Sequence, residues 1–299
     1  MQPAFSVIFL TVLIGAGQGL FLALYACELA GFGAGASDRT LLAGGAAVAL
    51  VFSALGLLAS FFHLGHPERA WRAAAMWRTS WLSREVIVLP LFMTVVALWA
   101  LLHATQGAGG ATLALGLVAA VLAVALYVCT GMIYGCLKTI PRWNTWMTPA
   151  KYVLFGLMSG AVLLPAVLSL RPAEVGPVGK PMMAILLLAI GMVFYVAYLL
   201  KHPRKTHRIN DALGFREGNV RLLDAGHSHG TFLTNEFGFV LARERARLLR
   251  WAAIVCGFVL PLLLCYFSKW FWTASVICLI GLLVERWLFF AEAEHVVRL

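Results

Sequence analysis

Residues 250–290 read RWAAIVCGFVLPLLLCYFSKWFWTASVICLIGLLVERWLFF, and this stretch decides the fold of the chain. It contains two long apolar runs, 250–268 and 271–290, which are joined only through residues 268–270. About 20 helical residues cross the hydrocarbon core of a bilayer, so each run is long enough to span it. The short connection predicts that the two runs form a tight helical hairpin in a membrane.

Six further apolar runs precede this hairpin, and together they predict an all-α integral membrane protein with eight transmembrane helices in a single membrane domain. Of the 299 residues, 62% are hydrophobic and only 12% are charged. The first run lacks a basic flank and is too long for a signal peptide, so we expect a retained first helix. The long polar stretch 201–250 is too short for a sizeable core of its own. The six runs are 4–31, 41–64, 85–104, 111–137, 150–170 and 181–200.

The net charge of +10 is distributed unevenly along the chain. With eight spans, both termini and the connections 65–84, 138–150 and 201–249 lie on one side, and these segments carry most of the lysines and arginines. Cytoplasmic loops are enriched in these residues, so we expect this side, including both termini, in the cytoplasm. Alternatively, the positive charge binds anionic lipid or an acidic partner without setting the orientation. In a chain this apolar, the charge does not indicate nucleic acid binding.

The cysteines and histidines predict neither a metal site nor a haem. All six cysteines fall within predicted spans, and none forms the CxxC pair used by many zinc and iron–sulfur sites. Haem b needs axial ligands that face each other from packed helices, and His63 with His202 or His295 is a conceivable set. However, no helix carries two inward histidines, one per leaflet. We interpret the sequence GHSHG at 226–230 as a solvated loop.

Several ionisable residues fall in or beside the predicted spans, where they are costly and usually face the bundle interior. Glu28 lies near the end of the first span, and Glu285 with Arg286 lies inside the last. An adjacent pair cannot share one helix face, so we expect each to find a structural partner on another helix. Glu85 begins the third span.

Glu85 lies on the same side of the membrane as His63 and Arg69. A histidine, an arginine and a carboxylate at one interfacial level can hold a quinone carbonyl and relay its protons. From spacing alone, interfacial anchoring remains open as the alternative role of these residues.

A short internal similarity suggests two four-helix bundles, 1–145 and 146–299. Residues 65–69 (GHPER) follow the second span, and residues 201–205 (KHPRK) follow the sixth. Both place His-Pro and a basic residue after the second helix of a four-helix half, as a parallel duplication would.

The sequence FHLGHPERA at 62–70 and the sequence TIPRWNTWMTP at 139–149 resemble the DmsC family. These are the membrane anchor subunits of dimethyl-sulfoxide-reductase-type molybdoenzymes. The order of eight spans agrees with that family across nearly the whole chain, and the start of the third span at 83–85 (SRE) is similar too.

The resemblance implies a multi-pass subunit of a bacterial inner membrane that exchanges electrons with the quinone pool, as ubiquinone or menaquinone. Its partners would be an iron–sulfur electron-transfer subunit and a molybdopterin catalytic subunit, which would hold the clusters and the molybdopterin. The family anchor typically has no haem.

The resemblance also carries a quinone site onto His63, Gly65, Arg69 and Glu85. His63 would handle protons, Arg69 would stabilise developing negative charge, and Glu85 would orient the histidine or pass protons. His66 replaces the small polar residue familiar at its position. It either adds a second proton-handling group to the quinone site or contacts the partner protein.

Two features favour the sulfite-oxidising branch of these complexes, in which the catalytic subunits stay in the cytoplasm. The expected docking side is strongly basic, and the insertion 201–250, including FLTNEFG at 232–238, is similar to that branch. We therefore expect electrons from sulfite to pass to quinone. The alternative is a quinol-oxidising anchor of a dimethyl sulfoxide or related oxide reductase. A secondary transporter is disfavoured, because Pro90 and Pro165 are isolated and the polar groups are interfacial.

Overall fold

The computed structural model describes residues 5–31, 36–62, 64, 66–170, 181–201, 245–267 and 269–293. Within these ranges the chain forms eight helical spans long and apolar enough to cross a membrane, and no strand. The prediction of an all-α, eight-span membrane protein is confirmed. Seven spans are single helices: α1 (Phe5–Leu29), α2 (Ala36–Phe61), α3 (Trp81–Thr105), α4 (Gly110–Gly135), α5 (Met147–Leu168), α7 (Met182–Lys201) and α12 (Phe271–Ala291).

The remaining span, Ala246–Phe267, contains an irregular turn. It consists of α10 (Ala246–Ile254), the π-helical turn η2 (Val255–Val259) and α11 (Leu260–Phe267). Both α11 and η2 pack against α12, so the predicted hairpin forms. A side chain on Gly281 would collide with the backbone of Gly257, which explains why glycines lie where these helices cross.

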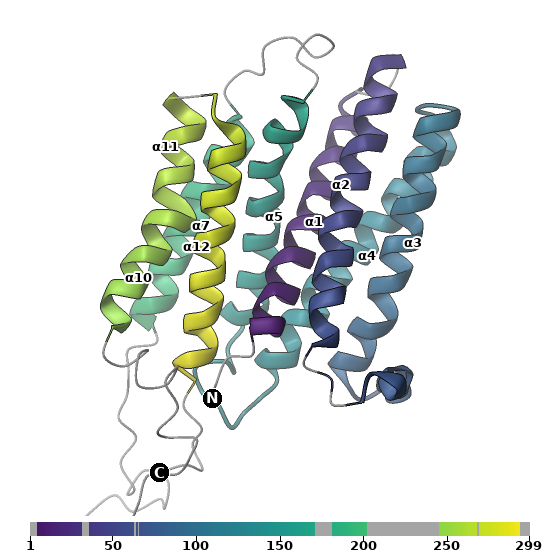
Figure 1. Cartoon of the computed structure of the whole chain (residues 1–299). Coiled ribbons are helices and arrows are strands. Elements are labelled where there is room, and N and C mark those ends of the chain that lie inside the picture. Colours follow the sequence, from purple (N-terminus) through teal and green to yellow (C-terminus); the bar gives the residue numbers. More distant parts are fainter. Residues whose placement is uncertain are drawn as a thin grey trace, which may run out of the picture.

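The helix α5 lies at the centre of the bundle (Figure 1). It packs against α1 and α4 on one side and against α7 and α12 on the other. One hydrophobic core is formed by α1 to α4 and includes Leu163 of α5, whereas a second core joins Phe155 of α5 to α7 and α12. Because α5 contributes to both cores, the division into halves at residue 145 remains a prediction.

Glycines bring α1 and α5 into close contact. A side chain on Gly19 would collide with the carbonyl of Gly156, and one on Gly160 would collide with the backbone of Gly19. Small residues of this kind let transmembrane helices approach closely. The contact fixes the position of α1 against α5 near the middle of both helices.

The start of α3 differs from the prediction by one helical turn. Ser80 has an extended backbone and its hydroxyl accepts a hydrogen bond from the Ser83 N–H at 3.3 Å, so the helix begins at Trp81 rather than at residue 85. The Arg84 guanidinium donates to the carbonyls of Trp77 at 2.9 Å and Arg78 at 2.8 Å, which holds the preceding connection against this end. Glu85 consequently lies within the helix instead of at its first residue.

The 3-10 helix η1 (Pro67–Ala74) carries the sequence motif that follows α2, and it packs against α3. In Figure 1 it lies at the lower end of the bundle, where α1 begins and α12 ends. Much of the predicted basic loop, residues 202–244, lies outside the described residues.

Candidate functional site

The predicted quinone site is described in part. His63 and Gly65 lie outside the described residues, as do the conceivable haem ligands His202 and His295. The structure describes the other three predicted site residues, His66, Arg69 and Glu85.

His66 and Arg69 lie together on the surface at the start of η1. His66 Nδ1 is 3.0 Å from Glu68 Oε1, and Arg69 Nε is 3.8 Å from the same oxygen. All three side chains are more than half exposed, so solvent or a partner can reach them. Contacts of this exposed kind contribute little to stability, which leaves these groups available for binding.

Glu85 is buried inside the bundle, near the start of α3, and the interfacial level that we expected for it stays a prediction. Its carboxylate accepts a hydrogen bond from the Thr130 hydroxyl of α4 at 2.5 Å. The added turn at the start of α3 places Glu85 four residues after Trp81, and the Glu85 side chain is turned toward α4. Among the described residues, no hydrogen bond or ion pair joins Glu85 to His66 or Arg69.

Glu85 lines a small cavity of mixed polar and apolar surface that is bordered by α1, α3, α4, α5 and α12. The free space is about 20 Å³, enough for roughly one water molecule where polar groups surround it. Several lining groups already have a local partner. Tyr127 donates to the carbonyl of Gly15 at 2.8 Å, and Ser159 donates to the carbonyl of Gly156 at 2.9 Å. The polar lining residues are Thr11, Gln18, Glu85, Tyr127, Thr130, Tyr152, Ser159 and Arg286.

Arg286 of α12 lines one side of this cavity. Its guanidinium carbon lies 3.8 Å from the centre of the Tyr152 ring, a cation–π contact with α5. The Arg286 Nε lies 3.8 Å from the neighbouring Glu285 Oε2. Both Nε and Nη1 are buried and have no hydrogen-bond partner among the described residues.

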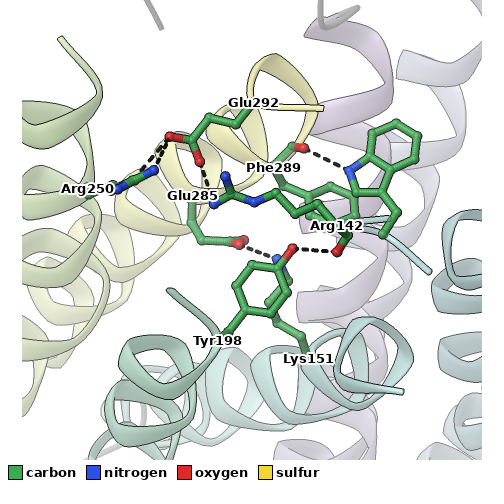
Figure 2. A network of polar contacts seen from close by, with 8 residues as sticks. Arg142, Lys151, Tyr198, Arg250, Glu285, Phe289 and Glu292 are labelled. Atoms are coloured by element: carbon green, nitrogen blue, oxygen red, sulfur yellow. Dashed lines mark hydrogen bonds and ion pairs between the residues drawn. The ribbon is translucent and has the colours of Figure 1, made fainter. Parts of the chain in front are cut away.

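A buried ion pair lies beside Arg286. Lys151 of α5 donates to Glu285 Oε1 at 2.6 Å, and Figure 2 shows this contact close to Tyr198. The Lys151 ammonium also lies 4.4 Å from the Tyr198 ring centre and 4.1 Å from that of Phe289. The prediction that Glu285 and Arg286 find partners on another helix is confirmed, since α5 supplies both. Their mutual 3.8 Å contact was not predicted from the sequence.

Lys151 itself was missed by the sequence analysis, although a signal was present. It is the only charged residue in the apolar run 150–170, and an ionisable group in such a run usually marks an internal partner. Its position at the start of the run made it look like part of the basic connection before it.

A second pair of contacts extends this cluster to the surface. Glu292 accepts from Arg142 at 2.6 Å and from Arg250 at 2.7 Å, and Figure 2 shows the carboxylate between the two guanidinium groups. The Tyr198 hydroxyl donates to the Arg142 carbonyl at 3.2 Å, which connects this part to Lys151. The Arg250 side chain is 29% exposed, so the cluster reaches solvent there.

Glu28 belongs to a separate cluster toward the other end of the bundle. Its carboxylate accepts hydrogen bonds from Trp99 Nε1 at 2.9 Å, His103 Nε2 at 3.1 Å and the Thr112 hydroxyl at 2.5 Å. These contacts tie α1 to α3 and α4. They fit the structural pairing that the sequence analysis expected for this residue.

A comparison with protein families then identifies the chain. Residues 1–291 match the family model described as DMSO reductase anchor subunit (DmsC). The chain belongs to this family. As a DmsC-family protein with eight apolar spans, it is a multi-pass membrane anchor subunit.

Two curated relatives of this DmsC-family chain differ in how much of it they match. It is 39% identical to a sulfite dehydrogenase subunit of Allochromatium vinosum, across 99% of this chain and 97% of that protein. It is 29% identical to anaerobic dimethyl sulfoxide reductase chain YnfH of Escherichia coli K12, across 52% of this chain and 54% of that protein.

Proposed function

We propose that the chain is the quinone-reactive membrane anchor of a heterotrimeric sulfite dehydrogenase. In this role it passes electrons from sulfite, oxidised in the cytoplasm, to the quinone pool through an iron–sulfur subunit. The observation that carries the proposal is the similarity to a subunit of a sulfite dehydrogenase over almost the full length of both chains. The similarity to the dimethyl sulfoxide reductase chain is lower and covers about half of each protein.

The chemistry of quinone reduction explains the residues assigned to the site. A quinone that accepts two electrons also takes up two protons, so it needs a proton donor and a charge that polarises a carbonyl. His63 would supply protons near neutral pH, and Arg69 would stabilise the developing negative charge. Gly65 and His66 belong to the same segment, which leads from α2 into η1.

Glu85 has a different role in this proposal from that of the exposed residues. It is buried on α3, the helix against which η1 packs. A buried carboxyl group that is hydrogen-bonded to a neutral hydroxyl can hold a proton and release it to a nearby base. We therefore assign Glu85 to proton supply rather than to direct contact with the quinone ring.

The surface around η1 supports docking of a partner on this side. Three arginines lie over neighbouring tryptophan rings at 5.6, 5.3 and 4.2 Å, and they form the pairs Arg72–Trp71, Arg78–Trp77 and Arg84–Trp81. Basic and aromatic groups of this kind suit an acidic protein surface or anionic lipid headgroups. We propose that the iron–sulfur subunit docks here and that the molybdopterin catalytic subunit binds through it, both in the cytoplasm.

Purification of the tagged chain from its native membrane tests the proposal. Two redox subunits should copurify, and the complex should reduce a soluble quinone analogue when sulfite is added. A complex that instead oxidises quinol with dimethyl sulfoxide would make the chain an oxide reductase anchor. Purification of the chain without redox subunits would favour the transporter alternative.

A further inference from the structure

The cavity beside Glu85 contains an unusual pair of buried charged groups. Glu85 on α3 and Arg286 on α12 line the same space, and their residues are 8% and 4% exposed. Two nitrogens of the Arg286 guanidinium have no hydrogen-bond partner in the described part of the chain. A buried donor without a partner has lost its hydrogen bonds to water, and this loss is larger for a charged donor. A water molecule in the cavity would satisfy this donor.

Arg286 connects the cavity to the buried charges behind it. Glu285 lies 3.8 Å from the Arg286 Nε and accepts from Lys151 at 2.6 Å. The guanidinium keeps its proton in proteins, so a proton passes Arg286 on water rather than through it. Glu285 and Lys151 do not line the cavity, but a carboxylate and an ammonium group can exchange protons with water that reaches them past Arg286.

The same cluster reaches solvent at the partly exposed Arg250 side chain. Tyr198 lies against Lys151 and donates to the Arg142 carbonyl. Arg142 pairs with Glu292, and Glu292 pairs with the partly exposed Arg250. The cluster thus contains four cations and two carboxylates.

We propose that this cavity is an internal water site through which protons reach Glu85 from the Lys151–Glu285 pair. The inference rests on the proposed function, in which each quinone receives two electrons from the iron–sulfur subunit and two protons from the protein. Glu85 gives its proton toward the reduced quinone oxygen, and the cavity water returns a proton to the Glu85 carboxylate. The Lys151–Glu285 pair then takes up a replacement proton from the aqueous side near Arg250.

Gly15 offers a way to displace this water without distorting the helices. It lines the cavity, and a Cβ atom added there would lie 3.9 Å from both the Gly156 Cα and the Tyr127 ring. These are ordinary contact distances, so Gly15→Ala fits while its methyl group occupies the space of the water. Gly15→Ser adds a hydroxyl group that can replace the hydrogen bonds of the water.

Two rates measured on the purified complex test the route. Gly15→Ala should lower sulfite-dependent quinone reduction by on the order of tenfold, because proton supply becomes limiting. Sulfite oxidation with a soluble dye that takes electrons from the partner subunits should stay unchanged. Gly15→Ser should recover part of the quinone rate. Gly44→Ala is the matched control and should leave both rates unchanged, because a Cβ atom at Gly44 has nothing within 4 Å.

X-ray radiolytic labelling with ¹⁸O water provides a readout independent of turnover. Tyr127 and Tyr152 should be labelled from the cavity in the wild type and protected in Gly15→Ala. Unlabelled tyrosines in the wild type, or a normal quinone rate in Gly15→Ala, would overturn the route and leave the proposed function standing. A wild-type complex that reduces no quinone at all would overturn the proposed function, and the route with it.

Discussion

Lys151 on α5 donates a hydrogen bond to Glu285 on α12 at 2.6 Å, and the two side chains are 0% and 1% exposed. Burying two charges in the membrane interior is expensive unless each has its partner. The pair therefore fixes the register of two helices that are more than 100 residues apart in the chain. It also places a buried ion pair beside Arg286, which lines the cavity.

Removal of one member of this pair should be more damaging than removal of both. Lys151→Met leaves the Arg286 guanidinium at 3.8 Å as the one partner of Glu285 among the described residues, so we expect a loss of about 3–5 kcal/mol in stability. The double variant Lys151→Met/Glu285→Leu should lose less than the sum of the single variants. Thermal unfolding of the purified complex measures these changes, and strictly additive effects would show that the two charges are not coupled.

His63→Ala should abolish quinone-coupled turnover and leave sulfite oxidation with an artificial soluble acceptor largely intact. The reason is that the histidine would supply protons to the quinone, whereas the dye takes electrons before they reach the membrane anchor. Parallel assays with both acceptors on the same membranes provide the measurement. Loss of both activities would indicate failed assembly, and normal quinone turnover would move the site elsewhere in the bundle.

Glu85→Gln should slow quinone reduction without preventing assembly. The amide can still accept the hydrogen bond from Thr130, but it cannot give up a proton at neutral pH. Glu28→Gln is the matched control, since Glu28 is equally buried but hydrogen-bonded in the cluster with Trp99 and His103. Rates are normalised to the amount of assembled complex. An equal slowing in both variants would argue against a specific role for Glu85.

The orientation can be tested with a reporter fused after Leu299. The excess of lysine and arginine in the loops on that side predicts a cytoplasmic signal. A fusion after Ala108, in the connection between α3 and α4, serves as the opposite control and should report the periplasm. A periplasmic signal from Leu299 would contradict the sulfite-type orientation and favour an exported reductase.

Deletion of residues 216–236 should release the redox subunits from the membrane. The segment 201–250 contains ten basic and five acidic residues, which suits an acidic partner surface. Fractionation of membranes followed by a sulfite–dye assay of the soluble fraction gives the result. Retention of the full complex on the membrane would indicate that the segment faces lipid instead.

The sequence predicted the fold well because apolar runs of this length have one stable arrangement in a bilayer. It predicted the site less completely. The Ser80 cap is a local signal, and recognising it would have moved the start of α3 to Trp81 and placed Glu85 inside the helix. The Lys151–Glu285 contact depends on how α5 and α12 pack, and a single sequence does not contain that register.

The positions of the two buried clusters have a bioenergetic consequence. Glu85, Arg286 and Glu292 lie toward the end of the bundle where η1 is, whereas Glu28 is engaged by its own donors in the other cluster. In the proposed reaction, electrons and protons would thus enter from the same compartment. No net charge would cross the bilayer, so the transmembrane voltage, worth about 2.3 kcal/mol per charge at 100 mV, would neither drive nor oppose turnover. The complex would supply quinol to the membrane. The enzymes that oxidise this quinol would then generate the protonmotive force.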